Sequence, residues 1–411
     1  MKTLTFLLLI LILALSNANS TIRGVPGSYT TIQSAINAAN TGDTVLVEPG
    51  TYYENINFRG KHIVVTSRFY INNDLTFIQA TTIDGSTPLN SDSASVVIIG
   101  SGADSTTILQ GFRITGGTGT KWTDEHAAGI YREGGGVLIA LSSPVVRFNI
   151  IVNNTAMNTS GVNGAGGGGI RSGDGKPKIL NNIIMNNTAK YGAGIVLNYT
   201  GATVKNNIIY GNSMSSTYSA GAGIWANNVL GTNKNLIENN TIFGNSSLNG
   251  TAGILSIYSA SLIIRNNIIW GNTSPGNTQI MPASGGSVTV TYCDVQNGYA
   301  GAGNINVYPQ FTDSNFVLSN SSPCIDAGDS SIIYNDPSDP GNPSNPKFPS
   351  KGTLRNDMGA YGGPLSSVIS SVTIIGIQNI KSSLPEGYRM YQNYPNPFNP
   401  VTKIMFAIPK S

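Results

Sequence analysis

The sequence predicts an all-β solenoid, in which a chain of short strands is wound into stacked coils that form parallel sheets. Two observations lead to this prediction. Between residues 149 and 272 one phrase recurs five times, as NIIVNN, NNIIMNN, NNIIYGN, NNTIFGN and NNIIWGN. The asparagines on which the copies align are 33, 25, 33 and 27 residues apart, an interval typical of repeat proteins rather than of globular enzymes.

The chain opens with the features of a secretory signal peptide at residues 1–18. Lys2 precedes an unbroken apolar run over residues 6–15, and residues 16–18, Ser-Asn-Ala, supply a small-x-small cleavage pattern. The run is too short to span a membrane, and no later stretch reaches transmembrane length. We therefore expect an exported protein without a transmembrane segment.

A short amphipathic helix is expected next, at about residues 31–39. Thr30 or Thr31 is suited to its N-cap position. The positions that then fall on one apolar face are Ile32, Ala35, Ile36 and Ala39. An exposed coil edge invites pairing with other chains, so we expect this helix to cover the N-terminal end of the stack.

Each repeat contains two strand-like runs, one led by glycine, as in Gly-Gly-Val at 135–137, and one led by asparagine. Runs this short bury a face only when coils stack, at about 4.8 Å per coil, around a shared core. Two columns of aliphatic residues are expected to point inward. They are Val146, Ile179, Val204, Ile237 and Ile264, and Ile151, Ile184, Ile209, Ile242 and Ile269.

Two polar columns complete the expected coil. The residue before each alignment asparagine fits a corner, where side-chain amides bond the coils above and below. A second column is expected to face water as a ladder of alternating charge, without a catalytic role. It consists of Arg147, Leu180, Lys205, Glu238 and Arg265.

The composition limits the classes of partner that the protein could bind. Charged residues make up only 10% of the chain, against about 25% in ordinary soluble domains, and the net charge of +3 is spread without a basic run. This argues against nucleic acid as a partner. The two cysteines, Cys293 and Cys324, cannot form a disulfide framework but could pair with each other. Two separate buried thiols are the alternative.

The first coil carries a family resemblance. The stretch VPGSYTTIQSAINAANTGDTVLVEPGTYYENINF, at 25–58, resembles the opening of right-handed parallel β-helix proteins of the pectate-lyase-like superfamily. The phrases TVTYCDVQNGYAGAGNINVYPQF, SPCIDAGD and DMGAYGG resemble the closing coils of its bacterial surface members. The resemblance implies a β-helix domain over residues 24–363. It implies no single activity, because the superfamily includes lyases, hydrolases, epimerases and proteins with no known reaction.

The end of the chain carries a second resemblance. Residues 364–383 are expected to form a linker. In residues 384–411 the phrase YPNPFNP at 394–400, followed by alternating apolar residues, resembles the start of the C-terminal sorting domain of the type IX secretion system. That domain is a small β-sandwich, and the pattern still runs at Ser411, so we expect a truncated sorting segment. The resemblance implies the secretion machinery as a partner and an extracellular or cell-surface location.

The sequence gives little direct sign of a reaction. Glycoside hydrolysis needs two carboxylates about 5–10 Å apart. Over residues 135–290 the acidic residues are Asp174 and Glu238, far apart in sequence. The motifs of polygalacturonase-like hydrolases are missing. So is the acidic cluster with which calcium-dependent lyases bind the metal. No metal site is predicted, and Ca²⁺ would be a cofactor only if the protein were a lyase.

One loop differs from the rest of the chain. Residues 121–136, KWTDEHAAGIYREGGG, concentrate charge in a nearly uncharged sequence. The candidate catalytic residues are Asp124, Glu125, His126, Arg132 and Glu133, and the candidate sugar-binding residues here are Trp122 and Tyr131. These groups could bind a sugar or support proton transfer. Alternatively, Asp124 or Glu133 pairs with Arg132 or Lys121 only to fix the loop.

A column of outward residues gives a second candidate surface. It reads Val152, Met185, Tyr210, Phe243 and Trp270. Tyr210, Phe243 and Trp270 are expected to stack as a flat strip suited to sugar rings. The alternative is that irregular loops or the tail cover the strip.

The preferred function is therefore a secreted or cell-surface protein that contacts polysaccharide along its flank, with activity unproven. One alternative is a polysaccharide lyase or glycoside hydrolase with its site in the 121–133 loop. Another is an adhesin or structural surface protein.

Overall fold

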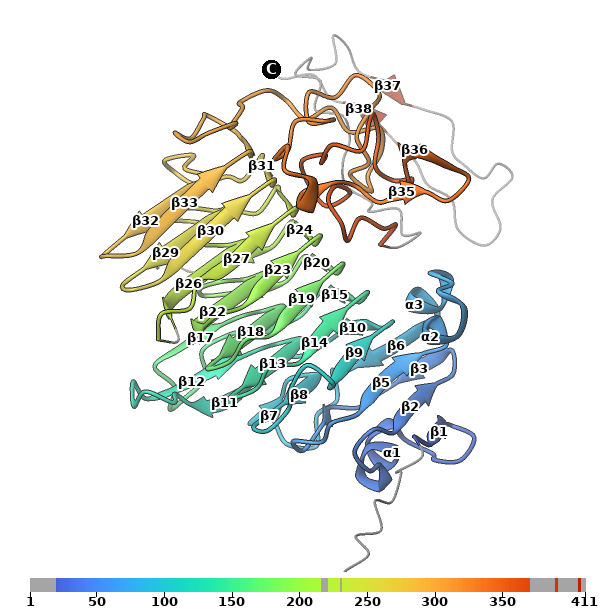
Figure 1. Ribbon diagram of the computed structural model, residues 1–411. Coiled ribbons are helices and arrows are strands. Elements are labelled where there is room, and N and C mark those ends of the chain that lie inside the picture. The colour runs from blue at the N-terminus through green and yellow to red at the C-terminus, as the bar shows by residue number, and fades with distance from the viewer. Residues whose placement is uncertain (1–19, 216–220, 230, 370–388, 391–405, 408–411) are drawn as a thin grey trace, which may run out of the picture.

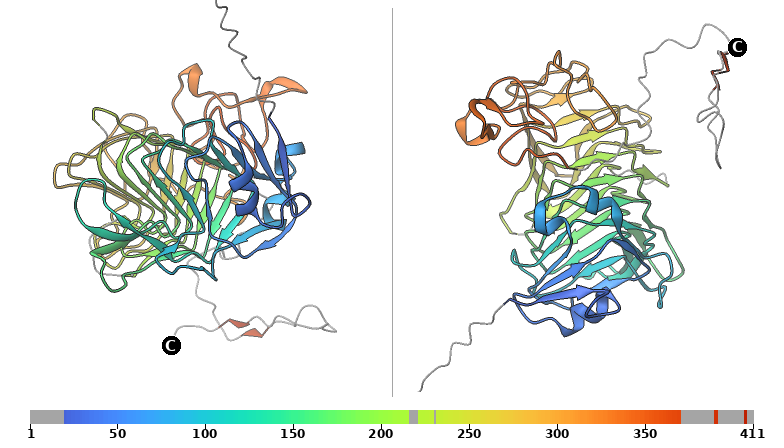
Figure 2. Two further views of the ribbon diagram at one scale, coloured as in Figure 1. Left: turned by 90° about the horizontal axis from the view of Figure 1, so that it is seen from below. Right: turned by 90° about the vertical axis from the view of Figure 1, so that its right-hand side faces the viewer.

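The chain is wound into a solenoid of three long parallel sheets, which confirms the predicted fold class (Figure 1). The computed structural model describes residues 20–215, 221–229, 231–369, 389–390 and 406–407. Viewed along the axis, the coils lie over one another around a common interior (Figure 2). Within the described ranges, no helix is long and apolar enough to cross a membrane.

The three sheets, here called A, B and C, are followed in turn by each coil. Sheet A contains β1 (Ile22–Val25), β2 (Thr44–Val47), β5 (Val64–Ser67), β9 (Ile108–Gln110), β14 (Val145–Arg147), β19 (Lys178–Leu180), β23 (Thr203–Lys205), β27 (Asn235–Glu238), β30 (Ser261–Arg265) and β33 (Ser287–Thr291). Sheet B contains β3 (Gly50–Tyr52), β6 (Thr81–Asp84), β10 (Arg113–Thr115), β15 (Ile150–Val152), β20 (Ile183–Met185), β24 (Ile208–Tyr210), β28 (Thr241–Phe243), β31 (Ile268–Trp270) and β34 (Asp294–Val295). Sheet C contains β4 (Ile56–Asn57), β8 (Val97–Ile99), β13 (Val137–Ala140), β18 (Ile170–Gly173), β22 (Ile195–Thr200), β26 (Ile224–Val229), β29 (Ile254–Ile257) and β32 (Ile280–Ala283).

Shorter strands and helices lie outside the three long sheets. A fourth sheet, D, joins β7 (Ser93–Ala94), β11 (Gly119–Thr123), β12 (Ile130–Glu133) and β17 (Gly164–Gly166). The remaining strands are β16 (Thr155–Ala156), β21 (Thr188–Ala189), β25 (Ser213–Met214), β35 (Ser338–Asp339), β36 (Asn342–Pro346), β37 (Arg389–Met390) and β38 (Phe406–Ala407). The helices are α1 (Ile32–Ala38), α2 (Phe69–Asn72), α3 (Thr76–Ala80) and the 3₁₀ helix η1 (Ile332–Tyr334). The signal peptide and most of the linker and sorting segment lie outside the described residues.

The two predicted aliphatic columns form the core. Strand pairing places Ile209 between Ile184 and Ile242, and Val204 between Ile179 and Ile237. All ten predicted inward residues are fully buried and belong to one cluster that runs through the stack. Because side chains alternate between the faces of a strand, a repeated aliphatic position necessarily lines the interior.

Helix α1 closes the N-terminal end as expected. Thr31 is the N-cap, and its hydroxyl oxygen accepts the N–H of Ser34 while the Ser34 hydroxyl oxygen accepts the N–H of Thr31. Ile32, Ala35 and Ile36 are buried against β1, β2 and β4. The helix therefore covers the apolar end of the first coil.

The corners are built from two neighbouring asparagines with different roles. The expected corner residues, such as Asn206, do turn the chain, with φ of 55°. The amide ladder, however, comes from the residue after the corner. Asn207 Nδ2 donates to Ile179 O at 2.8 Å and to Asn240 Oδ1 at 3.0 Å, and Asn207 N–H also bonds Asn240 Oδ1. The ladder was thus predicted one residue too early, because the left-handed backbone turns the corner amide outward while the next one points inward.

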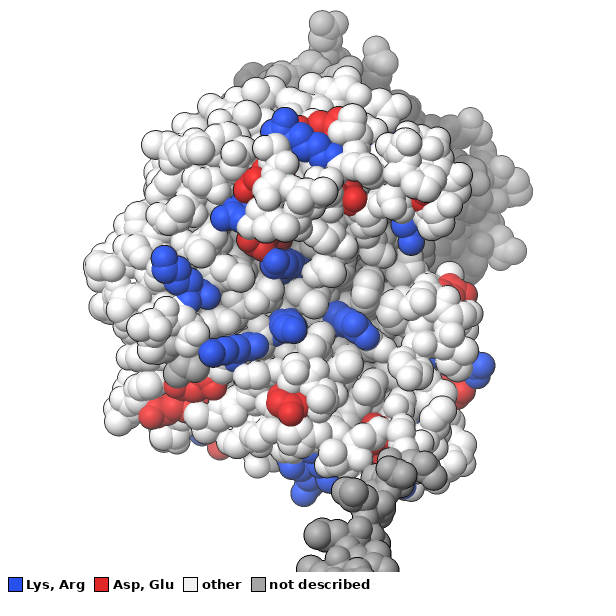
Figure 3. Space-filling view, in the orientation of Figure 1, with Lys and Arg blue, Asp and Glu red and all other residues white. Residues whose placement is uncertain are grey.

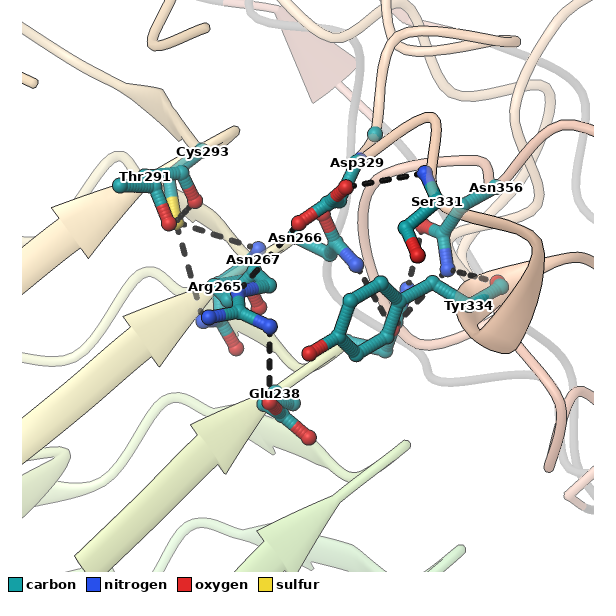
Figure 4. Close-up of polar contacts among 12 residues, drawn as sticks. Glu238, Arg265, Asn266, Asn267, Thr291, Cys293, Asp329, Ser331, Tyr334 and Asn356 are labelled. Atoms are coloured by element: carbon teal, nitrogen blue, oxygen red, sulfur yellow. Dashed lines mark hydrogen bonds and ion pairs between the residues drawn. The ribbon is translucent and has the colours of Figure 1, made fainter. Parts of the chain in front are cut away.

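The charged column is less solvated than expected. Figure 3 shows several Lys and Arg side chains over the middle strands of sheet A, with Asp and Glu side chains scattered above and below them on a mostly uncharged face. Lys205 and Arg265 do flank Glu238, but the Glu238 side chain is only 7% exposed. Arg265 also lies 4.6 Å above the centre of the Tyr334 ring, in the C-terminal segment (Figure 4). The prediction of a water-facing ladder is therefore wrong at Glu238, because its carboxylate lies between the side chains of Lys205 and Arg265.

Residues 298–369, here called the C-terminal segment, fold back beside the last coils (Figure 2). Asn206 Nδ2 donates to Ala360 O and Gly362 O, and Asn239 Nδ2 donates to Asp357 O. The corner asparagines thus serve as docking points for this segment.

Candidate functional site

The charged 121–133 loop is a β-hairpin that stands on the flank of the solenoid. In its antiparallel register Lys121 faces Arg132 and Trp122 faces Tyr131. β11 also pairs with β7, and β12 with β17, so both sides of the hairpin are tied into sheet D. Its side chains are therefore held by regular structure rather than by a free loop.

A buried ion cluster joins this hairpin to sheet C. The guanidinium of Arg171, on β18, makes two hydrogen bonds to Glu125, at 3.0 and 2.8 Å. Arg171 Nε lies 2.5 Å from Glu133 Oε2, and the arginine side chain is fully buried. A Cβ on Gly173 would lie 2.3 Å from Arg171 Nη1, so the glycine leaves the room that the guanidinium occupies.

Burial sets the protonation behaviour of this cluster. Burial would lower the pKa of Arg171, but the charges of Glu133 and Glu125 raise it above its ordinary value. Burial raises the pKa of Glu133, and the Arg171 charge and the Tyr191 hydroxyl, which donates to Glu133 Oε1 at 2.9 Å, offset this only in part. For Glu125, burial acts in the same direction, but the hydrogen bonds and charge of Arg171 prevail and lower its pKa. The pKa values of these two glutamates, which contact the same arginine, are therefore shifted in opposite directions.

The tip of the hairpin is held by three contacts with sheet C and the loops that follow its strands. His126 Nε2 lies 2.9 Å from Asp174 Oδ1, and its ring stacks on Tyr199 with 3.5 Å between centroids. Asp124 Oδ2 accepts a hydrogen bond from Asn198 Nδ2. These contacts fix the tip above β22.

A pocket of about 470 Å³ lies between the hairpin and sheet C. Aromatic rings, amides and two carboxylates line it. The lining residues are Asp124, Ala128, Tyr131, Glu133, Tyr191, Asn198, Tyr199, Trp225, Asn227, Asn228 and Tyr258. Trp225 is only 7% exposed, and its indole N–H has no hydrogen-bond partner in the described part of the chain. A concave surface with aromatic walls and a few polar groups is typical of small-molecule sites.

The structure brings together only part of the predicted constellation. Asp124, Glu133 and Tyr131 line the pocket, and Glu125 and His126 support it. Arg132 does not, because its guanidinium donates to Ser91 O and Gly119 O and pairs with Asp92. The alternative pairing of Asp124 or Glu133 with Arg132 or Lys121 is also wrong, since both cations pair with Asp92 instead.

Trp122 has a supporting position as well. Its Nε1 donates to Glu125 Oε1 at 2.8 Å, and the residue does not line the 470 Å³ pocket. Trp122 therefore lies outside this pocket, and its role as a sugar-binding residue stays a prediction.

The expected aromatic strip is covered. The Phe316 ring lies 5.3 Å from the rings of both Tyr210 and Phe243, and Phe311 packs on Phe243 at 5.8 Å. Trp270 contacts Tyr308 at 6.1 Å. The prediction of an open flat surface on Tyr210, Phe243 and Trp270 is thus wrong, because the C-terminal segment packs on these rings.

The two cysteines are separate buried thiols. Cys293 lies in the central core, whereas Cys324 packs in a different cluster outside sheet B and bonds Asp294 Oδ2 at 3.2 Å. The disulfide left open by the sequence is therefore not formed. Among the described residues, no group of three or more His, Cys, Asp or Glu residues could hold a metal ion.

Comparison with known families decides the classification. The family model described as right-handed beta helix region matches residues 69–276. The chain belongs to this family.

Solved structures give a weaker likeness to this β-helix protein. Pectate lyase Pel9A is 14% identical with a TM-score of 0.39, over 83% of this chain and 96% of that one. The pectin methylesterase from Aspergillus niger is 12% identical with a TM-score of 0.36, over 73% and 93%. A pectin methylesterase in complex with a hexasaccharide is 10% identical with a TM-score of 0.37, over 69% and 91%. No curated protein matches the sequence.

Several site residues of this β-helix protein were missed from sequence. They are Arg171, Tyr191, Asn198, Tyr199, Trp225, Asn227, Asn228 and Tyr258. The alternation of side chains along the strands could have identified three of these residues. Arg171 and Trp225 follow the inward residues Ile170 and Ile224, and Asn198 follows Leu197, so alternation places all three on the outer face of sheet C.

Proposed function

We propose that this β-helix protein is an exported carbohydrate-binding protein that holds a sugar of a glycan chain in the pocket beside the β11–β12 hairpin. The observation that carries the proposal is the lining of that pocket. Five aromatic residues surround it, and ring faces cover the apolar C–H patches of sugars. Amides, hydroxyls and carboxylates beside them supply the hydrogen bonds that sugar hydroxyls need.

The position of the pocket suits a polymer. Asn198 and Asn227 occupy matching positions on β22 and β26, and Tyr258 follows β29, one coil further. The lining thus extends over successive coils on the flank of the solenoid. A polysaccharide bound at this pocket would continue along the same side of the stack.

The framework of the site favours binding without large rearrangement. The hairpin is tied to sheet D on both sides, and Arg171 anchors it to β18. A preformed pocket avoids the ordering cost that weakens binding by mobile loops.

Export completes the proposal. The signal peptide at residues 1–18 and the sorting-domain resemblance at residues 384–411 support secretion through the type IX machinery to the cell surface or medium. Fractionation of cells that express the chain with and without residues 384–411 tests this part. Retention of both forms inside the cell would contradict it.

A glycan array and calorimetric titration test the binding function. Tyr258→Asn removes one ring wall, and because Tyr258 is 51% exposed with φ of 53°, asparagine fits the backbone without disturbing the core. We expect roughly three- to tenfold weaker binding. Tyr53→Asn, at an exposed tyrosine far from the pocket, is the matched control. An array on which no glycan binds would leave the adhesin or structural role as the better explanation.

Catalysis by the same pocket is the second candidate function. Asp124 and Glu133 both line the pocket, and burial raises the pKa of Glu133, so the two carboxyl groups lie in contrasting environments. Pairs of carboxyl groups in contrasting environments serve as acid and base in glycoside hydrolases. Release of new reducing ends, or of unsaturated sugars in the presence of Ca²⁺, would support a hydrolase or a lyase respectively. Binding without either product supports the first candidate.

A further inference from the structure

We propose that the sugar selected by this pocket is positively charged, namely a protonated amino sugar. This inference rests on the proposed carbohydrate-binding function and adds the substrate class. It follows from the charges that face the pocket, from the aromatic rings of its walls and from the amide side chains in its lining.

The charges around the pocket are predominantly negative. Asp124 is the carboxylate of the lining that is not paired with a basic side chain among the described residues, whereas Glu133 is paired with Arg171. Lysine and arginine are absent from the described lining. The nearest arginine, Arg171, is fully buried beneath the pocket, where Glu125 and Glu133 already contact it. A uronic acid would place its carboxylate beside these carboxylates without a free cation to receive it.

The basic residues of the hairpin are turned away. Lys121 and Arg132 line a different pocket of about 370 Å³, together with Asp92. The hairpin therefore separates its charges, with cations on one side and Asp124 and Glu133 on the other. An ammonium group is attracted to the acidic side and an anion is not.

The walls also suit a cation. Tyr131, Tyr191, Tyr199, Trp225 and Tyr258 line the pocket. Aromatic ring faces carry negative potential and attract ammonium groups, and Trp and Tyr are the preferred residues for this interaction. Combined with the carboxylates, these rings resemble the cages in which cationic ligands are held.

Amide side chains in the lining indicate that the ligand also carries hydroxyl groups. Asn198, Asn227 and Asn228 line the pocket. An amide both donates and accepts hydrogen bonds, so the hydroxyl oxygens of a sugar can pair with it. A simple ammonium ion has no such oxygen, whereas an amino sugar has both groups.

Three oligosaccharides of equal length test the inference on the mature chain. They are hexamers of glucosamine, of N-acetylglucosamine and of galacturonic acid, which are cationic, neutral and anionic. We expect affinity to fall in that order, with roughly tenfold between the first two, and we expect added salt to weaken only the cationic hexamer. Calorimetric titration at low and high salt measures both effects.

Asp124→Asn makes the test specific to the pocket. The carboxylate accepts the N–H of His126 through Oδ1 and the Asn198 amide through Oδ2. Asparagine retains the first acceptor and loses only the second contact, which involves a neutral amide. We expect the variant to lose several-fold affinity for the glucosamine hexamer and to keep its affinity for the N-acetylated one. Asp313→Asn is the matched control, because exposed Asp313 accepts the N–H of Asn315 in the same way, far from the pocket.

The outcomes separate the two proposals. Equal or tighter binding of the neutral or anionic hexamer, still weakened by Tyr258→Asn, overturns the charge inference and leaves the binding function intact. An unchanged glucosamine affinity in Asp124→Asn also overturns it. If no hexamer and no glycan on the array binds, both proposals fail.

Discussion

Arg171 Nη2 lies 2.8 Å from Glu125 Oε2, which links the exposed hairpin to a strand 46 residues later in the sequence. Both side chains are almost completely buried, and the same guanidinium contacts Glu133. The hairpin is therefore fixed by a charge cluster rather than by apolar packing alone. The contact makes the stability of the site depend on one arginine.

Arg171→Met is expected to destabilise the protein strongly. The change leaves Glu125 and Glu133 buried without their cation, which typically costs about 3–5 kcal/mol. Urea denaturation measures the loss. Arg147→Met, at a half-buried arginine whose Nε bonds Gln110, should cost about 1 kcal/mol. An equal loss of unfolding free energy in the two variants would contradict a stabilising role of the buried ion cluster.

Asn207→Ala is expected to break the inner ladder. The Asn207 amide is fully buried and bonds Ile179 O, Lys205 O and Asn240 Oδ1, while its oxygen accepts the N–H of Asn182. Several unpaired groups remain in the core, so we expect a loss of about 3 kcal/mol or more in unfolding free energy. Asn320→Ala, at an exposed asparagine bonded to Lys351, should change it by less than about 0.5 kcal/mol. A similarly small effect at Asn207 would contradict the role of the ladder.

The C-terminal segment is expected to lose stability as pH rises. Burial and mutual charge raise the pKa of Asp336 to about 8, and burial raises that of Asp357 to about 7. Because these folded-state values exceed the ordinary carboxyl value of about 4, the protonated forms favour folding. That contribution is complete below about pH 4 and is lost as pH rises through about 7 and 8.

Asp336→Asn isolates this effect, since asparagine cannot ionise. The stability of the variant relative to the wild type should rise between pH 5 and 9, by at most about 1.4 kcal/mol per pH unit. Thermal unfolding at several pH values measures the difference. Asp313→Asn, at an exposed aspartate, is the matched control. A relative stability that is flat with pH would mean that Asp336 is ionised in the folded protein.

Both thiols are expected to be unreactive in the folded protein. Burial raises the pKa of Cys293 to about 12, and burial together with the charge of Asp294 raises that of Cys324 well above its usual value. The thiolate is the reactive form, so a thiol reagent should label neither residue before unfolding and both afterwards. An unfolded, unreduced chain without free thiols would instead indicate a disulfide.

The sequence was sufficient for the fold because the repeat fixes it locally. Ile184, Ile209 and Ile242 recur at equivalent positions, and a period of two within each strand can place such residues only on the inner face. The offset of the ladder by one residue arose because Asn206 and Asn207 are chemically identical. Only the backbone conformation separates the corner residue from the one that points inward.

The site was less predictable because its parts come from distant coils. The hairpin stood out by its charge, but the partners of Glu125 and Glu133 lie on β18 and beyond, where a lone arginine has no local motif. The prediction of an exposed aromatic strip was wrong because a distant segment covers it. Nothing near Tyr210 indicates that Phe316, more than a hundred residues later, folds back on it.

The stacked arrangement has a mechanical consequence for the proposed pocket. Each coil is bonded mainly to the coils directly above and below it, so opening of the cylinder would begin at its two termini and proceed inward one coil at a time. The pocket rests on β18, β22 and β26, with three strands of sheet C before them and two after them. Unfolding that starts at the ends of the stack would therefore remove the outermost coils before it reaches the residues that line the pocket.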